Sequence, residues 1–558
     1  MRDKQANRRI RLLLAGFALV FAGTLARAVW LQGVQAARLG GMASRQHHES
    51  ITIPAGRGTI YDRHGVQLAI GEQTMTVYAD PRQVANPRAI AVAAHRLLGV
   101  DADALYPQLL NKKSSFVYVQ RFADPKAAAE LIKRGFTGVN AYPEEKRVYP
   151  LRTVAAQVVG FAGTDDKGLG GLEIQYDHDL SGKTGKQTIV RDPFGRAIDV
   201  ISATPERQGH DVFTTIDQTI QANAESVLRE TIAKWHAKSA SAVVLDPRTG
   251  AVLAMAQAPG YDANKSSRVP FAIQRNRAVT DTYEPGSTFK LVTIAGALET
   301  GLVAPTTRFT LPYSIRVADR TIHDAELRGT ERLSVAEILS HSSNVGAVTI
   351  AERLGRTDLS DWITRFGFGK KTGLDFPGES PGQVLPPEQW SGSTIGNVPI
   401  GQGIAVTPIQ MASAYAAIAN GGVWVQPHLV DRIGGRRLHD FKHVRIVTPA
   451  VDAALKKMLT GVVDEHGGTG GEAAIPGYTV AGKTGTAQKP GPHGYTTGKY
   501  VASFVGMVPV AKPRLLVLVK VDEPTSNIFG GVVAAPAFAQ IAKFDLQHLS
   551  VPPDAPVH

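Results

Sequence analysis

The sequence predicts an α+β protein with an N-terminal transmembrane helix, an elongated mixed α/β domain and a larger domain around one antiparallel sheet. Three observations indicate this: an apolar run of about 20 residues near the N-terminus, alternating strand-like and helix-like runs in the first half, and strand-like runs flanking a helical stretch in the second half. A chain of 558 residues also exceeds what one hydrophobic core usually organises. The expected segments are a basic tail (1–11), a transmembrane anchor (12–31), a pedestal or dimerisation-like domain (33–205), a larger domain (206–545) and a C-terminal tail (546–558).

The apolar run of residues 12–31 is long enough to cross a bilayer as one helix. Positive charge before it predicts that the N-terminus lies inside the cytoplasm and that the chain after residue 31 is exported. Residues 12–26 would also suit a signal peptide, with Ala26-Arg27-Ala28 as its cleavage site. We favour a retained anchor, because apolar character continues through residues 29–31. The basic residues before the run are Arg2, Lys4, Arg8, Arg9 and Arg11.

The composition excludes several classes of protein. The chain has no cysteine, which rules out disulfides, a cysteine nucleophile and thiolate metal sites. Its 16 histidines form no H-E-x-x-H motif, so we expect no metal site. The net charge of +12 comes from scattered basic residues without interleaved aromatic residues, which favours a basic surface near anionic membranes or polymers over nucleic-acid binding.

The first half shows no cluster of catalytic side chains. Strand-like runs at 75–78 and 115–119 alternate with Ala-rich helical runs at 89–98 and 125–133. We therefore expect residues 33–205 to form a spacer or interaction domain.

The second half begins with a strand at 212–216 and a helix at 218–235 that Asp217 caps. Residues 246–250 join two apolar runs with the composition of a tight hairpin turn. The middle, 287–422, is mostly helical. Further strands are expected at 241–245, 251–256, 478–481, 500–508 and 515–521, and a closing helix at 536–543. Strands at both ends predict one antiparallel sheet assembled from distant segments.

A serine and a lysine at helical spacing are the first candidate catalytic residues. Pro285 and Gly286 break the preceding chain, so Ser287 falls in the first turn of a helix and Lys290 lies on the same face. A serine hydroxyl needs a base to become nucleophilic, and a lysine kept neutral by burial or by a second cation can serve. S-x-x-K alone is a weak signal, since a chain of this length contains it about once by chance.

Two further motifs could complete such a site. Ser342 and Asn344 lie in a loop between two helical runs, where S-x-N is more often a cap or turn. Lys483-Thr484-Gly485-Thr486 follows a strand-like run, where a lysine and two hydroxyls could bind a carboxylate and Gly485 would allow close backbone approach. K-T-G also occurs at 183–185 and 371–373, but in turn-rich surroundings.

Two other motif matches lack the required context. Residues 477–484 fit G-x-x-x-x-G-K-[ST], but their interior prefers strand and no helix follows, so a nucleotide site is disfavoured. Residues 378–382 fit G-x-S-x-G, but prolines surround Ser380, which indicates a loop rather than a nucleophile elbow.

S-x-x-K, S-x-N and K-T-G in this order resemble the active-site signature of penicillin-binding proteins and serine β-lactamases. Residues 57–65 (RGTIYDRHG), 168–180 (GLGGLEIQYDHDL) and 400–422 are similar to class B penicillin-binding proteins, and 283–290 (YEPGSTFK) with 342–346 (SSNVG) look most like the septal, cell-division branch. Departures are His64 where Asn is usual, Leu291 where Pro often follows, and Ala534 where the septal branch often has Ser. The resemblance implies a transpeptidase domain with an antiparallel sheet flanked by helices.

The resemblance also implies roles for five residues. Ser287 would attack the penultimate D-Ala carbonyl of a peptidoglycan stem peptide, and a neighbouring stem's amine would then resolve the acyl-enzyme into a cross-link. Lys290 would take the serine proton, Ser342 would relay it to the leaving amine, and Asn344 would hold the substrate amide and Lys290. Lys483 would keep Lys290 neutral by charge repulsion.

In the same family pattern, Thr484 and Thr486 would hold the substrate carboxylate beside Gly485. The backbone N–H groups of Ser287 and Thr486 would form the oxyanion hole. β-Lactams would acylate Ser287, and neither a cofactor nor a metal is implied.

The resemblance implies partners and a location as well. Expected partners are peptidoglycan stem peptides, β-lactams, the membrane, and division-complex membrane proteins including a polytopic glycan polymerase, with no nucleic acid. The expected location is the inner membrane, as a single-pass protein at the division septum with its catalytic domain outside the cytoplasm. Alternatives are an elongation-type transpeptidase, a D,D-carboxypeptidase or β-lactamase, and a non-catalytic β-lactam-sensing receptor or division scaffold.

Overall fold

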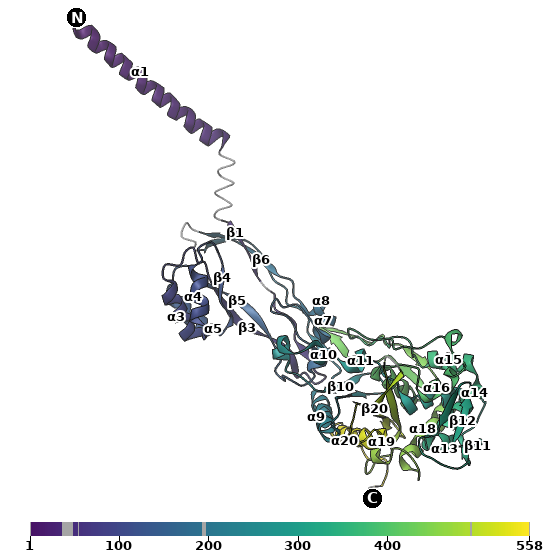
Figure 1. The fold of residues 1–558 in the computed structure, drawn as a ribbon. Helices are drawn as coiled ribbons and strands as arrows, with labels where there is room; N and C mark the ends of the chain where they lie inside the picture. The colour runs from purple at the N-terminus through teal and green to yellow at the C-terminus, as the bar shows by residue number, and fades with distance from the viewer. Residues whose placement is uncertain (1, 36–47, 54, 192–196, 492–493, 557–558) are drawn as a thin grey trace. The chain divides into compact units, whose positions relative to one another are not determined.

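The computed structural model describes residues 2–35, 48–53, 55–191, 197–491 and 494–556 (Figure 1). The chain divides into two compact units, one formed by residues 1–56 and 182–209 and the other by residues 57–181 and 210–558. The larger unit contains a seven-stranded sheet and a five-stranded sheet.

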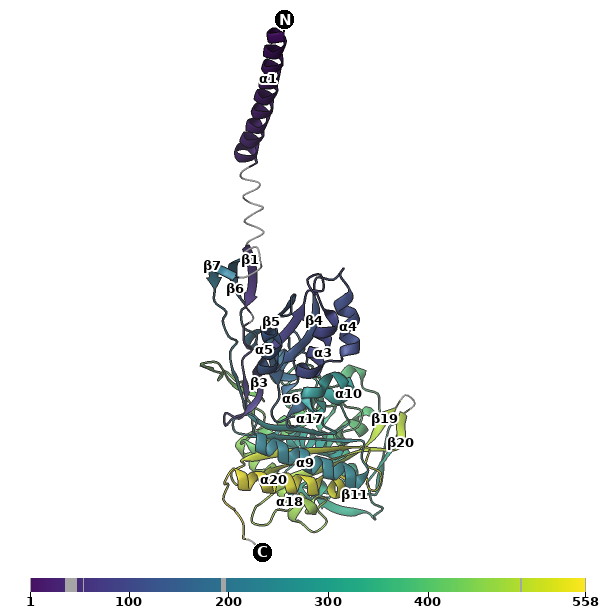
Figure 2. The same cartoon turned by 90° about the vertical axis from the view of Figure 1, so that its left-hand side faces the viewer.

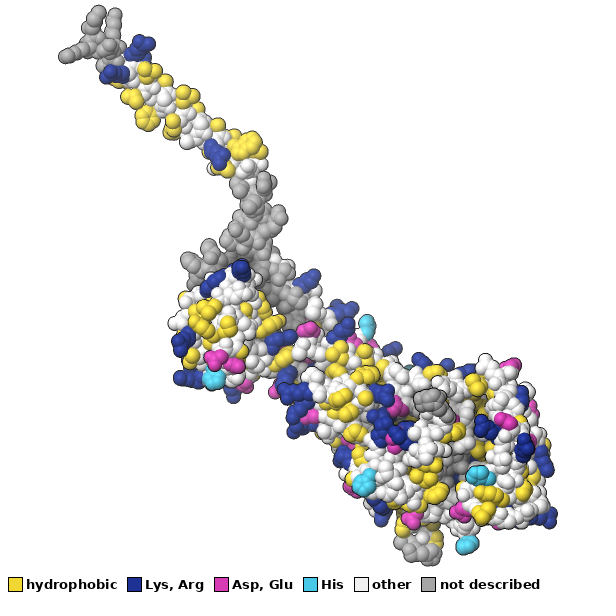
Figure 3. Space-filling view, viewed as in Figure 1, with side chains coloured by type: hydrophobic (Ala, Val, Ile, Leu, Met, Phe, Trp, Pro, Cys, Tyr) yellow, Lys and Arg dark blue, Asp and Glu magenta, His cyan; other side chains and the backbone are white. Residues whose placement is uncertain are grey.

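The smaller unit contains an apolar helix and a three-stranded antiparallel sheet. Helix α1 (Arg2–Val29) continues into a short π-helix, η1 (Trp30–Val34), which confirms the helix predicted for 12–31. Asn7–Val34 is long and apolar enough to cross a membrane, and Figure 3 shows its apolar side chains. The sheet has the order β1–β6–β7, formed by His48–Ile53, Gly185–Arg191 and Ala197–Thr204.

A seven-stranded sheet opens the larger unit. Its order is β17–β16–β8–β2–β3–β4, with β5 also paired to β3. It thus joins strands from the first half with β16 and β17, which lie between the S-x-N and K-T-G motifs in the chain. The strands are β2 (Ile60–Tyr61), β3 (Gln67–Ala79), β4 (Val117–Ala123), β5 (Val139–Val148), β8 (Val212–Thr214), β16 (Val430–Ile433) and β17 (Arg436–Arg437).

The two helices predicted in the first half, at 89–98 and 125–133, are confirmed, and a further helix at 102–110 was not predicted. For α3, Asn86 accepts a hydrogen bond from the backbone N–H of Ala89, and Gly99 ends the helix with φ of +70°. Apolar side chains of these helices pack on β3 and β4 in a core of their own. The helices are α3 (Pro87–Leu98), α4 (Ala102–Leu110) and α5 (Pro125–Lys133).

A buried ion-pair network connects the two family-like segments of the first half. Arg57 Nε donates to Glu173 Oε2 at 2.7 Å, and Arg57 Nη1 donates to Asp177 Oδ1 at 2.8 Å. Arg147 Nε donates to the other oxygen of Glu173 at 2.6 Å. The side chains of Arg57 and Glu173 are both 0% exposed, so their charges are compensated within this network and not by water.

The second sheet is the predicted antiparallel sheet built from distant segments. Its order is β10–β9–β21–β20–β19, and every neighbouring pair is antiparallel. The strands are β9 (Ser239–Leu245), β10 (Val252–Ala258), β19 (Ala481–Gly491), β20 (Gly494–Val508) and β21 (Leu515–Asp522). The strand predicted for 478–481 begins only at Ala481, so the K-T-G motif lies inside β19 instead of following a strand.

Helices cover both faces of this sheet, which explains why β9, β10 and β21 are buried at every position. Val244 of β9 packs in one hydrophobic cluster with α9 (Gln218–Trp235) and α20 (Ala535–His548). Its neighbour Val243 packs in another with α17 (Pro408–Ala419), because successive side chains of a strand point to opposite faces. Figure 2 shows α9 and α20 side by side. The closing helix predicted for 536–543 extends to His548.

The middle of the larger unit is mostly helical, as predicted, but four short strands between 308 and 334 were missed. They are β11 (Arg308–Leu311), β12 (Ser314–Val317), β13 (Arg320–His323) and β14 (Glu331–Ser334), paired as β11–β14 and β12–β13. Four residues are too few for the strand period to be told from the helix period.

The remaining elements are short or support the site. The longer helices are α12 (Lys290–Glu299), α13 (Val335–Ser340), α14 (Asn344–Leu354), α15 (Arg356–Arg365) and α18 (Pro449–Asp464). Short helices are α6 (Ala156–Val159), α7 (Gly171–Gln175), α8 (Asp177–Leu180), α10 (Phe271–Gln274), α11 (Arg277–Thr280), α16 (Thr394–Asn397) and α19 (Gly530–Val533). The described elements also include five 3₁₀ helices, η2 (Ala263–Arg268), η3 (Gly286–Phe289), η4 (Pro387–Gln389), η5 (Val398–Ile400) and η6 (Gly471–Ala473). The last two strands, β15 (Val423–Val425) and β18 (His443–Arg445), pair with each other.

Candidate active site

Ser287 lies in η3, a 3₁₀ turn that leads directly into α12. Its neighbours Thr288 and Phe289 are buried, whereas Ser287 itself is only partly buried. The hydroxyl of Tyr415, on the fully buried helix α17, donates to the backbone carbonyl of Thr288 at 2.8 Å. The buried helix α17 therefore supports the turn, while Ser287 stays partly accessible to solvent.

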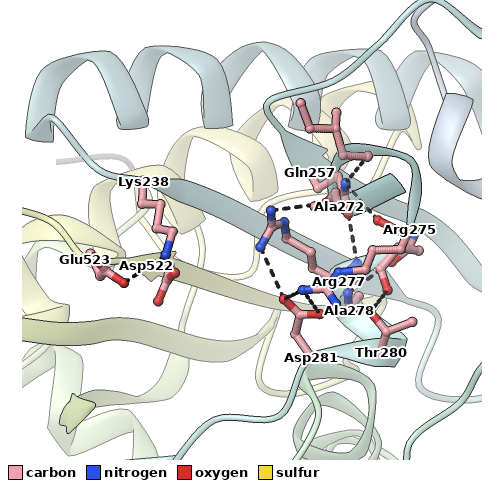
Figure 4. Close-up of polar contacts among 12 residues, drawn as sticks. Lys238, Gln257, Ala272, Arg275, Arg277, Ala278, Thr280, Asp281, Asp522 and Glu523 are labelled. Carbon is pink, nitrogen blue, oxygen red and sulfur yellow. Dashed lines mark hydrogen bonds and ion pairs between the residues drawn. The ribbon is translucent and has the colours of Figure 1, made fainter. Parts of the chain in front are cut away.

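A polar network holds the chain that enters this turn (Figure 4). Asp281 accepts hydrogen bonds from Arg275 and Arg277, both at 3.2 Å. The side chain of Gln257, on β10, accepts from the backbone N–H of Arg277 at 2.9 Å. The segment before Ser287 is thus attached to the central sheet by the side chain of Gln257, which binds the backbone of α11.

Two glycines allow the serine turn to lie against strand β19. Gly286 has φ of +58°, and a Cβ there would stand 2.8 Å from the carbonyl oxygen of Thr486. A Cβ on Gly485 would stand 2.8 Å from the carbonyl oxygen of Pro285. Side chains at either position would separate the turn from the strand, so these glycines bring Ser287 and Thr486 together.

Lys290, the candidate base, is fully buried and has three acceptors for its amine. Its Nζ donates to Asn344 Oδ1 at 2.8 Å, to Ser342 Oγ at 3.2 Å and to the backbone carbonyl of Ser342. The structure thus joins the S-x-x-K and S-x-N motifs, which lie 52 to 54 residues apart in the chain.

Burial lowers the pKa of Lys290 to about 7, and the carboxylate of Asp324 opposes this shift. Burial, and then the charge of Lys290, lower the pKa of Lys483 well below its usual value. The family resemblance implied that charge repulsion from Lys483 keeps Lys290 neutral, but the lowered pKa of Lys290 comes from burial. Both amines are fully buried, so the site disfavours two positive charges at once.

The S-x-N loop has a constrained backbone. Ser342 lies between α13 and α14 with φ of +61°, a left-handed conformation that is uncommon for serine. The side-chain amide of Asn344 donates to the carbonyl oxygen of His323 at 3.0 Å, so its Oδ1 is left facing Lys290. These contacts orient both polar side chains toward the amine.

Asp324 is a site residue that the sequence analysis missed. Its carboxylate accepts hydrogen bonds from Ser343 Oγ at 3.0 Å and from the backbone N–H of Val345 at 3.0 Å and of Asn344. Arg328 donates to the same carboxylate at 2.9 Å. Asp324 therefore caps α14 from outside and fixes the S-x-N loop. Asp324 follows β13, a strand that the sequence analysis did not predict, and it belongs to no recognisable motif.

The K-T-G motif supplies a second buried amine. Lys483 Nζ donates to Thr484 Oγ1 at 3.2 Å and to Thr469 Oγ1 at 3.5 Å, and the two threonine hydroxyls are 2.7 Å apart. Thr486 Oγ1 accepts from the backbone N–H of Gly530 at 3.0 Å. Thr469 was also missed, because it lies in a loop without a recognisable motif.

The competing motif matches lie elsewhere. Lys183 belongs to the smaller unit. In the K-T-G at 371–373, the backbone N–H of Thr372 donates to Glu379 at 2.6 Å within a loop. The same loop contains Ser380, so the G-x-S-x-G match is a loop as predicted.

Comparison with known proteins accounts for almost the whole chain. A family model of the penicillin-binding protein transpeptidase domain matches residues 240–543, and one of the penicillin-binding protein dimerisation domain matches residues 52–214. The chain belongs to the penicillin-binding protein family. With a dimerisation domain before its transpeptidase domain, this penicillin-binding protein is of class B, as the resemblance implied.

Relatives of this penicillin-binding protein match over nearly full length. Peptidoglycan D,D-transpeptidase FtsI of Escherichia coli is 34% identical and is matched over 98% of this chain and 93% of its own. Probable peptidoglycan D,D-transpeptidase PbpC of Pseudomonas aeruginosa is 34% identical over 99% of this chain and 97% of its own. Penicillin-binding protein 3 of Mycobacterium tuberculosis in complex with aztreonam has a TM-score of 0.72 and 31% identity, covering 91% of this chain and 99% of that one. The apolar helix α1 and this family fit a single-pass inner-membrane protein.

Proposed function

We propose that this penicillin-binding protein cross-links peptidoglycan stem peptides in septal wall synthesis through an acyl-enzyme on Ser287. One observation carries the catalytic assignment: the fully buried amine of Lys290, with a pKa of about 7, stands three residues after Ser287 and contacts Ser342 and Asn344. An amine of this kind is neutral often enough at physiological pH to accept a proton.

In the proposed first step, Ser287 Oγ attacks the penultimate D-Ala carbonyl as Lys290 takes its proton. Ser342, whose hydroxyl is 3.2 Å from Lys290 Nζ, relays that proton to the nitrogen of the departing D-Ala. Asn344 holds the amine of Lys290 and the substrate amide. The peptide C–N bond breaks and an ester to Ser287 forms.

Strand β19 supplies the binding side of the site in this proposal. Thr484 and Thr486 hold the terminal carboxylate of the stem peptide near Lys483, and the backbone N–H groups of Ser287 and Thr486 bind the oxyanion. Support comes from the close approach of Gly286 to Thr486. An amine of a second stem peptide then attacks the ester carbonyl, the ester C–O bond breaks, and the proton that the amine loses passes through the base to Ser287 Oγ.

The septal role rests on resemblance to relatives with cell-division names, such as FtsI of Escherichia coli. We infer that the N-terminus lies in the cytoplasm and the catalytic domain outside it, because basic residues precede the apolar helix. Division-complex membrane proteins, including a polytopic glycan polymerase, are the proposed partners.

The assignment is tested by labelling the purified protein with fluorescent penicillin. The wild type should be labelled and Ser287→Ala should not, since the ester cannot form. Ser380→Ala is the matched control, because Ser380 lies in the loop that fits a competing serine motif. Label on Ser287→Ala would show that another residue is the nucleophile. Lys290→Ala should fold normally but fail to acylate, and normal acylation would remove lysine from the base role.

Transfer is distinguished from hydrolysis by the product. A donor stem peptide with excess acceptor amine should yield the cross-linked dimer. A shortened monomer alone would identify a carboxypeptidase, and a stable acyl-enzyme with neither product would identify a sensor.

A further inference from the structure

Two histidines and an aspartate converge at a point outside the candidate active site. The Nε2 atoms of His64 and His548 each lie 3.0 Å from Oδ2 of Asp217. The three donor atoms all lie within 4.8 Å of one another. The residues come from a turn after β2, the N-terminus of α9 and the last turn of α20. His64 is also the residue that departs from the asparagine usual in the family.

Contacts outside the cluster fix Asp217 and the turn that contains His64. Oδ1 of Asp217 accepts from the backbone N–H groups of Thr219 and Ile220, so this oxygen caps α9 and Oδ2 alone faces the histidines. Oδ1 of Asp62 accepts from the backbone N–H of His64 at 2.8 Å, which fixes the turn. Supporting contacts of this kind are typical of preformed metal sites.

A buried carboxyl without a partner provides a second, independent observation. Asp545 precedes His548 by one turn of α20 and is 0% exposed. Among the described residues, neither of its oxygens has a hydrogen-bond partner. A divalent cation at the cluster, one helical turn from Asp545, would stabilise the charged form of this buried carboxyl.

We propose that His64, Asp217 and His548 bind a zinc ion, with Asp545 as the neighbouring carboxylate that the ion compensates. Two imidazoles and a carboxylate are a donor set that zinc prefers. Bond lengths near 2 Å in a tetrahedral site separate donor atoms by about 3.3 Å, close to the 3.0 Å between Oδ2 and each Nε2. Binding requires each Nε2 lone pair to be free, so any proton there moves to Nδ1.

Such an ion would connect three distant parts of the larger unit. It would link the turn at residues 62–66 to α9 and α20, which pack on the same face of the central sheet. The proposed role is stabilisation of the folded state, because an ion that binds only the folded chain raises its stability. The sequence analysis expected no metal site, since these residues share no short motif.

The test measures zinc on the untagged, detergent-solubilised full chain after EDTA treatment and equilibrium dialysis against ZnCl₂. The wild type should retain about one zinc ion per chain and unfold at a higher temperature with zinc. His64→Asn and His548→Gln should lose both effects. His178→Asn, at another exposed histidine of the same unit, should retain both. Penicillin labelling of every variant confirms folding, because none alters the serine turn.

Two results would overturn the site. One is a wild type that retains no zinc after dialysis. The other is zinc retention in His64→Asn equal to that of the wild type, which would place the ion elsewhere.

Discussion

The Nζ atom of Lys290 donates a hydrogen bond to Oδ1 of Asn344 at 2.8 Å. Lys290 begins α12 and Asn344 begins α14, so the contact joins the first turns of two helices. Asp324 in turn holds the backbone of Asn344. The position of the candidate base therefore depends on three segments of the chain at once.

Acylation by penicillin should depend on pH through Lys290. Its pKa is about 7, lowered by burial, and only the neutral amine can accept the serine proton. The second-order acylation rate should therefore rise about tenfold per pH unit below 7 and level off above it. Stopped-flow labelling between pH 5.5 and 9 measures this, with the thermal midpoint recorded at each pH to exclude unfolding. A flat profile would contradict lysine as the base.

Asp324→Asn should slow acylation by about 10- to 100-fold, because the S-x-N loop loses the carboxylate that fixes it. Asp324 raises the pKa of Lys290, so its removal should also shift the pH profile to lower pH. Asp319→Asn is the matched control, since this exposed aspartate lies in the same hairpin. A slower rate with an unshifted profile would limit Asp324 to a structural role.

Gly485→Ala should reduce acylation by at least about tenfold, because the added Cβ would stand 2.8 Å from the Pro285 carbonyl and push the serine turn from β19. The comparison is with Gly435→Ala, where no atom of the described residues lies within 4 Å of the new Cβ. Acylation rates of both variants give the result. Equal acylation rates in the two variants would show that acylation does not depend on the close approach of the serine turn to β19.

Glu173→Ala should lower the free energy of unfolding by about 3–5 kcal/mol, because it leaves the buried charge of Arg147 without its carboxylate and leaves Arg57 paired with Asp177 alone. Urea unfolding followed by tryptophan fluorescence measures the change. Glu130→Ala removes an exposed glutamate of the same half and should change little. A small effect at Glu173 would show that water or another carboxylate compensates Arg57.

Much of the fold follows from local patterns. The apolar helix, the helix capped by Asp217 and the hairpin at 246–250 were all predicted, because caps, turn residues and hydrophobic periodicity act over a few residues. The four-residue strands between 308 and 334 were not, since such short runs carry no distinct period. Because β13 was not predicted, the position of Asp324 directly after it was missed as well.

The sequence by itself determined the candidate nucleophile and base, through the spacing of Ser287 and Lys290 and the order of the three motifs. Tertiary structure alone decided that Lys290 is buried with a lowered pKa, that Asp324 holds its partner loop, and that His64 meets His548 across 484 residues of chain. The physical reason is range: helix and turn preferences depend on neighbours in sequence, whereas burial and the convergence of charged groups depend on which distant segments pack together.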